Sequence, residues 1–147
     1  MFFQAVEGGY IVRVERGEEL IGALKTLMEQ EQVGGGTVTG LGATSFARLG
    51  IYDVEARVYV DRTFEGVHEI CNLTGSLSWH DGAPFPHVHM VLSDFELRAI
   101  GGHCFEALAG ATIEVFVRSF EERIDREMDD DLGLHLLKLS GHATTGS

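Results

Sequence analysis

Hydrophobic and polar residues alternate along most of this chain, which is the pattern of β-strands that bury one face. Segment 111–120, for example, places Ile113, Val115 and Val117 at every second position. The same alternation, or a short apolar run, predicts strands at residues 10–14, 37–41, 46–52, 57–64, 66–79, 88–92, 97–100, 111–120 and 134–139. Sheet structure therefore dominates the predicted fold.

One stretch changes to helical spacing. Its apolar residues are Leu20, Ile21, Leu24, Leu27 and Met28. Glu18 and Glu19 precede them, where the helix dipole favours acidic residues, and three glycines at 34–36 end the pattern. The sequence therefore predicts one amphipathic helix between Gly17 and Gly34.

The order of these elements shows no alternation of parallel strands with helices. We therefore expect an α+β fold, a largely antiparallel, strongly bent β-sheet with one main helix packed on it. A chain of 147 residues is long enough for one domain and short for two. We predict a single domain over 1–147, with a core over about 8–120, a C-terminal strand at 134–139 and a flexible tail at 140–147. Unpaired strand edges and apolar faces favour association between copies of the chain.

The charge of the chain disfavours contact with nucleic acid. Eleven basic residues stand against 23 acidic ones, for a formal charge of −12. A DNA backbone repels such a surface unless a local basic patch overrides the repulsion, and the sequence contains no such patch. The most charged stretch, 121–131, is predicted to be a solvated loop or a short exposed helix.

Neither cysteine is expected to form a disulfide bond. Cys71 lies in an apolar run and Cys104 directly follows His103, so both are predicted to be buried free thiols, as suits a reducing compartment. A Cys104 thiolate is an alternative metal ligand, but in a strand it points away from His103. The N-terminus lacks a secretion signal, and no apolar stretch reaches membrane-spanning length. We therefore expect a cytoplasmic protein without a membrane segment.

Three of the seven histidines fall close together at the spacing of metal ligands. His87 and His89 are one residue apart inside a predicted strand, so both imidazoles leave the same face. His103 follows a second apolar run, and the polar Ser93–Asp94 pair between the runs predicts a hairpin. The third imidazole can therefore return to the first two.

The pairing register of this hairpin decides whether the three rings meet. A turn centred on Phe95 pairs His87 with His103 and His89 with Gly101, which puts all three rings on one face. A loop one residue longer or shorter turns His103 to the opposite face, unless a β-bulge compensates. If the rings meet, three neutral nitrogens leave a fourth position open, as in catalytic zinc sites. Cobalt, nickel, iron and copper also suit imidazole ligands. The alternative is that the histidines are ordinary polar residues on a half-exposed sheet.

Glu69 is the one acidic residue on the otherwise apolar face of the predicted strand 66–79. A carboxylate in that position is usually an edge residue. Near a metal it could instead act as a base or as an outer partner of a ligand imidazole. Glu69 is therefore the candidate catalytic residue.

Several short motifs together resemble the plants-and-prokaryotes-conserved (PPC) domain family, whose plant members carry AT-hook DNA-binding motifs. The motifs are Gly17-Glu18-Glu19-Leu20, Gly40-Leu41-Gly42-Ala43, Glu69-Ile70, Leu73-Thr74-Gly75-Ser76, Asp81-Gly82-Ala83-Pro84 with His87-Val88-His89, and Gly101-Gly102-His103. The resemblance runs from about Tyr10 to Arg118. It implies an α+β homotrimer and, in prokaryotic members, a metal, usually zinc, on the histidines that match His87, His89 and His103.

The same resemblance bears on activity. The fold is also similar to a domain of acetolactate decarboxylase, whose zinc is held by an HxH pair and a later histidine, which implies catalytic ancestry. For an enzyme, it implies a zinc-dependent lyase or hydrolase-like reaction. The plant proteins contact DNA through a short Arg-Gly-Arg-Pro core that this chain lacks, so direct DNA binding is not expected.

Three functions remain open from the sequence. The first is a homotrimeric metal protein whose zinc acts on a small oxygen-bearing substrate while Glu69 moves a proton. The second is a non-enzymatic regulatory or assembly module in which any metal is structural. The third is transcriptional regulation with DNA contact, against which the net charge argues.

Overall fold

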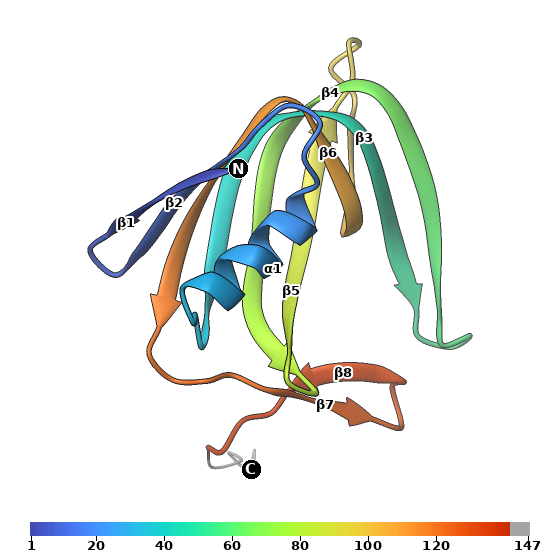
Figure 1. Cartoon of the computed structure of the whole chain (residues 1–147). Coiled ribbons are helices and arrows are strands. Elements are labelled where there is room, and N and C mark those ends of the chain that lie inside the picture. The colour runs from blue at the N-terminus through green and yellow to red at the C-terminus, as the bar shows by residue number, and fades with distance from the viewer. Residues whose placement is uncertain (142–147) are drawn as a thin grey trace, which may run out of the picture.

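The computed structural model of the chain describes residues 1–141, which form a strongly bent antiparallel sheet, one helix and a small separate hairpin (Figure 1). The elements are β1 (Phe2–Val6), β2 (Gly9–Val14), α1 (Leu20–Gln30), β3 (Gly35–Asp53), β4 (Val58–His80), β5 (Ala83–Ser93), β6 (Ala99–Phe120), β7 (Arg126–Asp129) and β8 (Leu134–Leu137). The main sheet has the strand order β1-β2-β6-β3-β4-β5, and β7 and β8 pair with each other. Within residues 1–141 no helix has the length and apolar character that crossing a membrane requires.

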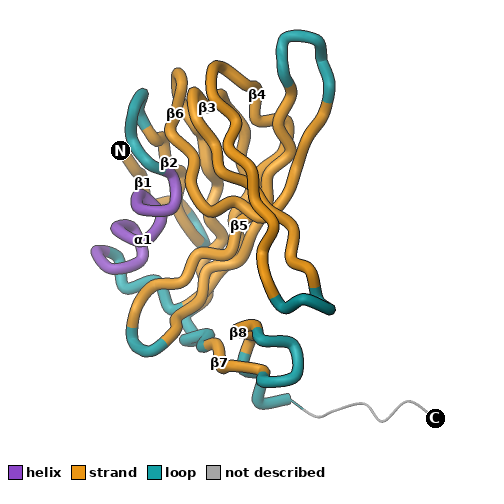
Figure 2. Tube along the Cα trace, turned by 90° about the vertical axis from the view of Figure 1, so that its right-hand side faces the viewer, coloured by secondary structure: helices purple, strands orange, loops and turns teal. Residues whose placement is uncertain are grey.

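The main sheet curls back on itself. β5 pairs with β4 along its length, and its last five residues also pair with the start of β6. The rest of β6 pairs with β3 and, near its end, with β2. Register shifts in β3 between Gly40 and Gly42 and between Thr44 and Phe46 mark bulges, which bend a strand and increase its twist. Beyond this bend, β3 and β4 descend as a long hairpin, which we call the β3–β4 arm (residues 46–65) (Figures 1 and 2).

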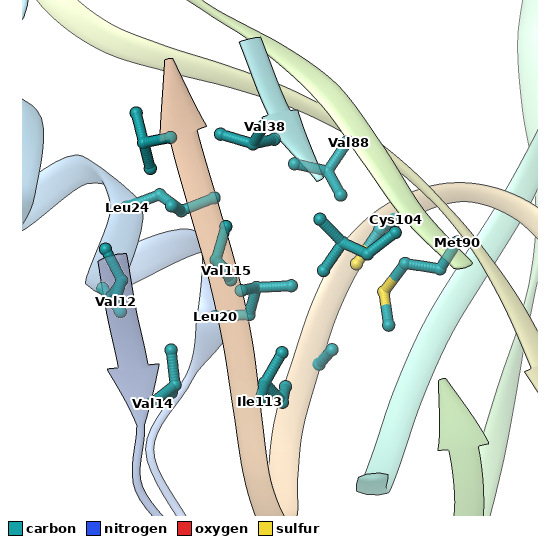
Figure 3. Close-up of a cluster of buried hydrophobic side chains, with 14 of the residues drawn as sticks. Val12, Val14, Leu20, Leu24, Val38, Val88, Met90, Cys104, Ile113 and Val115 are labelled. Atoms are coloured by element: carbon teal, nitrogen blue, oxygen red, sulfur yellow. The ribbon is translucent and has the colours of Figure 1, made fainter. Parts of the chain in front are cut away.

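Helix α1 covers one face of the curled sheet. Its N-cap residue, Glu19, accepts a hydrogen bond from the backbone N–H of Ile21 at 2.9 Å, which satisfies a donor at the open end of the helix. The fully buried side chains of the helix, Leu20, Leu24, Leu27 and Met28, point towards β5 and β6. Figure 3 shows Leu20 and Leu24 beside the valines of the neighbouring strands. Each such leucine contributes roughly 1.5–3 kcal/mol through burial, so this layer fixes β5 and β6 in place.

The predicted antiparallel sheet and single helix are confirmed for the described residues, but several boundaries differ. The strands predicted at 37–41 and 46–52 are one strand, and so are those predicted at 57–64 and 66–79, because bulges bend each strand without ending it. β1 was not predicted. The prediction of a loop or helix at 121–131 is wrong at residues 126–129, where pairing with β8 makes a strand. The expected flexible tail at 140–147 lies outside the described residues from position 142 onward.

The two cysteines lie in different environments. Cys104 is buried as predicted, and burial raises the pKa of its thiol to about 12. The prediction that Cys71 is buried is wrong, because a register shift between Ile70 and Asn72 in the β4–β5 pairing interrupts the alternation of faces and leaves Cys71 exposed. Both cysteines are free thiols.

Candidate metal centre

Two neighbouring strands bring three histidines to the face of the sheet that points away from α1. β5 supplies His87 and His89, whereas Val88 between them is fully buried on the helix side. β6 supplies His103, which lies directly opposite His89 in the antiparallel β5–β6 pairing. On its other side His103 pairs with Gly50 of β3. The third histidine therefore sits where the curled sheet closes.

The three imidazole rings gather around one point. Their ring centroids are 5.1 Å apart for His87 and His89, 5.0 Å for His87 and His103, and 5.4 Å for His89 and His103. The Nε2 atoms of His87 and His89 are 3.2 Å apart, and one ligand nitrogen from each of the three rings lies within 4.8 Å of the others. Nitrogens bound to a tetrahedral zinc ion lie roughly 3.4 Å from each other. The spacing therefore fits one divalent ion on three nitrogens.

The hairpin register differs from the expected one. The predicted pairing of His87 with His103 and of His89 with Gly101 is wrong, because His89 pairs with His103 and Gly101 pairs with Val91. Each partner has moved by two residues. Side chains in a strand change face at every residue, so a shift of two leaves all three imidazoles on the predicted face.

The loop between β5 and β6 explains this shift. Asp94 Oδ1 accepts hydrogen bonds from the backbone N–H groups of Glu96 and Arg98, at 2.9 and 3.0 Å, and its Oδ2 pairs with the Arg98 guanidinium. These contacts centre the turn on Glu96 instead of Phe95. The positive φ of 60° at Leu97 completes the turn. An aspartate at the start of a loop commonly caps backbone N–H groups in this way.

Burial favours the neutral form of two of the three histidines. Burial, followed by the charge of Arg126, lowers the pKa of His87 from 6.5 to about 4. Burial, followed by the two neighbouring histidines, lowers the pKa of His103 to about 4 as well. Both rings are therefore uncharged at neutral pH, which is the form that binds a metal ion.

The nitrogen atoms of the cluster fit a bound metal ion. His103 Nδ1 is buried and has no hydrogen-bond partner within residues 1–141, as is true of His80 Nδ1 and His135 Nδ1 outside the cluster, and a bound ion is one way to satisfy such an atom. The donor set of three imidazoles is one that zinc and neighbouring transition metals accept. Cys104 is not part of the cluster, as its position on the helix side predicts.

A hollow of about 390 Å³ opens beside His87 and His103. Besides these two histidines it is lined by Tyr59, Phe85, Phe105, Arg126, Gly133, Leu134, His135 and Leu136. The β7–β8 hairpin lies below the main sheet (Figure 1). Its residues line one side of the hollow. Two hydrogen bonds join the arm to the turn of that hairpin, from Tyr52 Oη to Leu132 O at 2.7 Å and from Arg57 Nη1 to Asp130 O at 3.1 Å. The histidine cluster thus adjoins a partly open hollow with mostly apolar walls.

Two residues of this hollow were missed in the sequence. The sequence predicts that Arg126 lies in the solvated charged stretch 121–131, and it gives His135 no role beyond its place in the predicted strand 134–139. In the structure Arg126 Nη2 lies 3.3 Å from His87 Nδ1, and the His135 ring packs at a tilt against the His80 ring with centroids 3.8 Å apart. Nothing in the local sequence indicates that the β7–β8 hairpin folds back against β5.

Glu69 lies apart from the histidines in a single copy of the chain. It is exposed on β4 and pairs with Ser93, four residues along β5 from His89. It does not line the hollow beside His87 and His103. Its role as a proton carrier stays a prediction.

The model of the Plants and Prokaryotes Conserved (PCC) domain family matches residues 3–121, which include all three histidines. No curated protein matches the chain. Three similar solved structures are a candidate DNA-binding protein from Bacteroides thetaiotaomicron, a plant- and prokaryote-conserved protein from Pyrococcus horikoshii and a metal-containing protein from Archaeoglobus fulgidus. Each is 28% identical to this chain, with TM-scores of 0.89, 0.84 and 0.82. They cover 93%, 96% and 95% of this chain, which in turn covers 96%, 97% and 99% of theirs.

The expected likeness to acetolactate decarboxylase extends to the fold alone. The enzyme from Bacillus subtilis is 13% identical with a TM-score of 0.54, and the match covers 83% of this chain and 57% of the enzyme. At this identity the likeness says nothing about the reaction.

Proposed function

Because the chain belongs to the Plants and Prokaryotes Conserved (PCC) domain family, we propose that it is a homotrimeric protein that binds one divalent metal ion, zinc first among the candidates, and acts on a small oxygen-bearing substrate. The convergence of His87, His89 and His103 on one point carries the proposal. The similar protein from Archaeoglobus fulgidus, which is described as metal-containing, supports it.

A divalent ion held there would supply Lewis acidity, which polarises a carbonyl group or lowers the pKa of a bound water molecule. The protein contributes the shape and the polarity of the site. Tyr59 and Phe105 pack against the His103 ring at centroid distances of 5.1 and 4.7 Å, which holds the ring in place and excludes water from one side. His87, His89 and His103 would hold the ion with three protein ligands, the number found in catalytic zinc sites, so a zinc-dependent lyase or hydrolase-like reaction is the proposed enzyme class.

The proposed trimer has a surface that could form it. On the β3–β4 arm, Ile51 lies directly opposite Val60, and the two residues are 73% and 55% exposed. Exposed apolar neighbours of this kind gain free energy when another copy of the chain covers them. The outer edge of β1 is also unpaired within residues 1–141. Glu69 does not reach the histidine cluster of its own chain. In a trimer, the proposed proton transfer would therefore require Glu69 of one copy to reach the cluster of a neighbouring copy.

The metal content of the protein tests the proposal. Purified protein is expected to carry or take up about one zinc ion per chain, measured by elemental analysis and by titration with a zinc-sensitive chelator. Protein that contains no divalent metal and takes up none would contradict it.

The oligomeric state is tested separately. Sedimentation equilibrium is expected to give three times the chain mass of 16.1 kDa. Both cysteines are free, which suits the proposed cytoplasmic location.

A second candidate is a regulatory module associated with DNA. The similar protein from Bacteroides thetaiotaomicron is described as a candidate DNA-binding protein, and this observation favours it. The charge of −12 opposes direct contact with a DNA backbone. A mobility shift of duplex DNA at micromolar protein that weakens as salt rises would support this candidate, and no shift at low salt would exclude direct binding.

A further inference from the structure

Arg126 is a cation without a carboxylate partner inside the hollow that adjoins the histidines. It belongs to β7, and within residues 1–141 its guanidinium forms no salt bridge. The two acidic neighbours of Arg126 in sequence are paired elsewhere. Asp125 Oδ1 lies 3.0 Å from Arg123 Nε, and Glu127 Oε2 lies 3.4 Å from Lys138 Nζ. In a chain of net charge −12, this local positive charge stands out.

Neutral groups hold the guanidinium in place. Its Nε donates to Ser78 Oγ at 2.8 Å, its Nη1 to the carbonyl oxygen of His135 at 2.7 Å, and its Nη2 to Ser76 Oγ at 3.2 Å. One face of the guanidinium lies over the Phe85 ring, 5.0 Å from its centroid. Burial lowers the pKa of Arg126 from its ordinary value, and the interaction with Tyr59, which acts in the opposite direction, does not cancel this effect. The side chain is thus positioned in advance but not neutralised.

The donors of this guanidinium are not all used. Arginine has five N–H groups, and the second N–H of Arg126 Nη1 has no acceptor within residues 1–141. An N–H of Nη2 faces His87 Nδ1 at 3.3 Å. If His87 binds a metal through Nε2, its Nδ1 carries a proton and cannot accept this hydrogen bond. Metal binding therefore frees a second N–H of Arg126.

From this arrangement we infer that the hollow binds a small organic carboxylate, which Arg126 holds beside the three histidines. A guanidinium with free N–H groups recognises a carboxylate in preference to a neutral oxygen group. The volume of about 390 Å³ is near the lower end of the range for small-molecule sites. The walls of Phe85, Phe105, Leu134 and Leu136 suit a short apolar body better than inorganic phosphate. The inference deepens the proposed function: that the bound carboxylate is the substrate rests on that proposal.

The test uses the full chain, zinc-loaded and metal-free, with three probes: propionate, its uncharged analogue propionamide, and inorganic phosphate. Ligand-observed NMR gives the affinities, and the zinc content of each sample is measured. Propionate is expected to bind at least tenfold more tightly than propionamide, and more tightly to the zinc-loaded form. Equal binding of propionate and propionamide, or tighter binding of phosphate, would overturn the inference. Equal affinity of the two forms would overturn the coupling through His87.

The matched variants are Arg126→Met and Arg123→Met, which remove the same charge three residues apart. Arg123 lies over the Trp79 ring and does not line the hollow. Arg126→Met is expected to lose at least tenfold in propionate affinity, and Arg123→Met to bind as the wild type does. Unchanged binding by a folded Arg126→Met protein contradicts the inference. If that variant does not fold, the Arg126 Nε–H resonance of the wild type decides: a saturable shift with propionate supports the inference, and no shift opposes it.

The two proposals fail in different ways. If the chain takes up no zinc, the proposed function fails, whereas propionate binding to metal-free protein that depends on Arg126 still supports the anion site. If zinc binds to the histidines and propionate does not bind, only the anion site fails.

Discussion

His89 and His103 lie directly opposite each other across the β5–β6 pair, with their ring centroids 5.4 Å apart. The pairing matters because His103 belongs at the same time to the β3–β6 ladder, where it faces Gly50. The cluster therefore exists only when the sheet has curled far enough for β6 to bridge β5 and β3. A metal ion on these histidines would therefore join β5 to β6 at the point where the sheet closes.

Replacing a histidine of the cluster is expected to weaken metal binding strongly while the fold is kept. His89 is exposed, so His89→Ala removes one of the three ligands without opening the core. Loss of a residue that only supports a metal ligand typically lowers metal affinity by roughly 10- to 100-fold, and loss of a ligand itself should lower the zinc affinity by more. The matched control is His68→Ala, because His68 contacts the carbonyl oxygen of Gly66 and lies outside the cluster. Competition with a zinc chelator measures both affinities. Equal affinity in the two variants would remove these histidines from the metal site.

A methyl group at Gly102 is expected to displace the backbone that holds His103 in the cluster. A Cβ atom there would lie 2.6 Å from the carbonyl oxygen of Gly50, across the β3–β6 ladder beside His103. Since backbone atoms cannot move aside as a side chain does, Gly102→Ala should cost about 1–3 kcal/mol of unfolding free energy and weaken zinc binding. Chemical denaturation measures the first effect and chelator competition the second. Gly141→Ala is the control, because a Cβ there would meet nothing within 4 Å. Wild-type stability and zinc affinity in Gly102→Ala would contradict this expectation.

The sequence predicted which histidines share a face, but it did not predict their pairing register. The HxH spacing placed His87 and His89 on one face, and the two-residue period kept His103 on that face although the turn is centred on Glu96. These are local rules of strand geometry, which depend on few residues. The register itself depended on Asp94 capping the loop, a contact that the residue types allow but do not require.

Long-range contacts explain most of what the sequence did not predict. Arg126 comes 39 residues after His87 in the chain and reaches it only because β7 and β8 fold back below the sheet. The alternation of residues 126–129 is too short to stand out within a charged segment. Cys71 was assigned to the wrong side because a bulge interrupts the period of two, and a bulge leaves no clear mark in the residue types.

The two cysteines are expected to react very differently with a thiol reagent. Cys71 is exposed, whereas Cys104 is buried and burial raises its pKa to about 12, so Cys104 forms almost no thiolate near neutral pH. Folded protein should therefore be alkylated at one cysteine, and denatured protein at both, as mass spectrometry can count. Cys71→Ser should abolish the reaction of the folded form. Rapid alkylation of Cys104 in folded Cys71→Ser protein would mean that the layer under α1 opens easily.

The metal-free protein is expected to lose stability as the pH falls from about 6.5 to about 4. Burial lowers the pKa of His87 and His103 from 6.5 to about 4 in the folded state. Within this range the unfolded chain therefore binds protons that the folded chain does not, and the free energy of unfolding falls as protons are added. Above pH 6.5 both states are neutral at these rings, so the two histidines add no pH dependence there.

Carboxylates titrate in part of the same range, so a difference between variants isolates the histidines. His103→Phe keeps an aromatic ring beside Tyr59 and Phe105 but cannot bind a proton. Without metal, the urea midpoint of this variant should fall less between pH 6.5 and pH 4 than that of the wild type, whereas His68→Phe should follow the wild type. Parallel curves for His103→Phe and the wild type would mean that His103 is not held neutral by burial. Zinc should then protect the wild type and His68→Phe but not His103→Phe, because protons and the metal compete for the same nitrogen atoms and only His103→Phe has lost one of them.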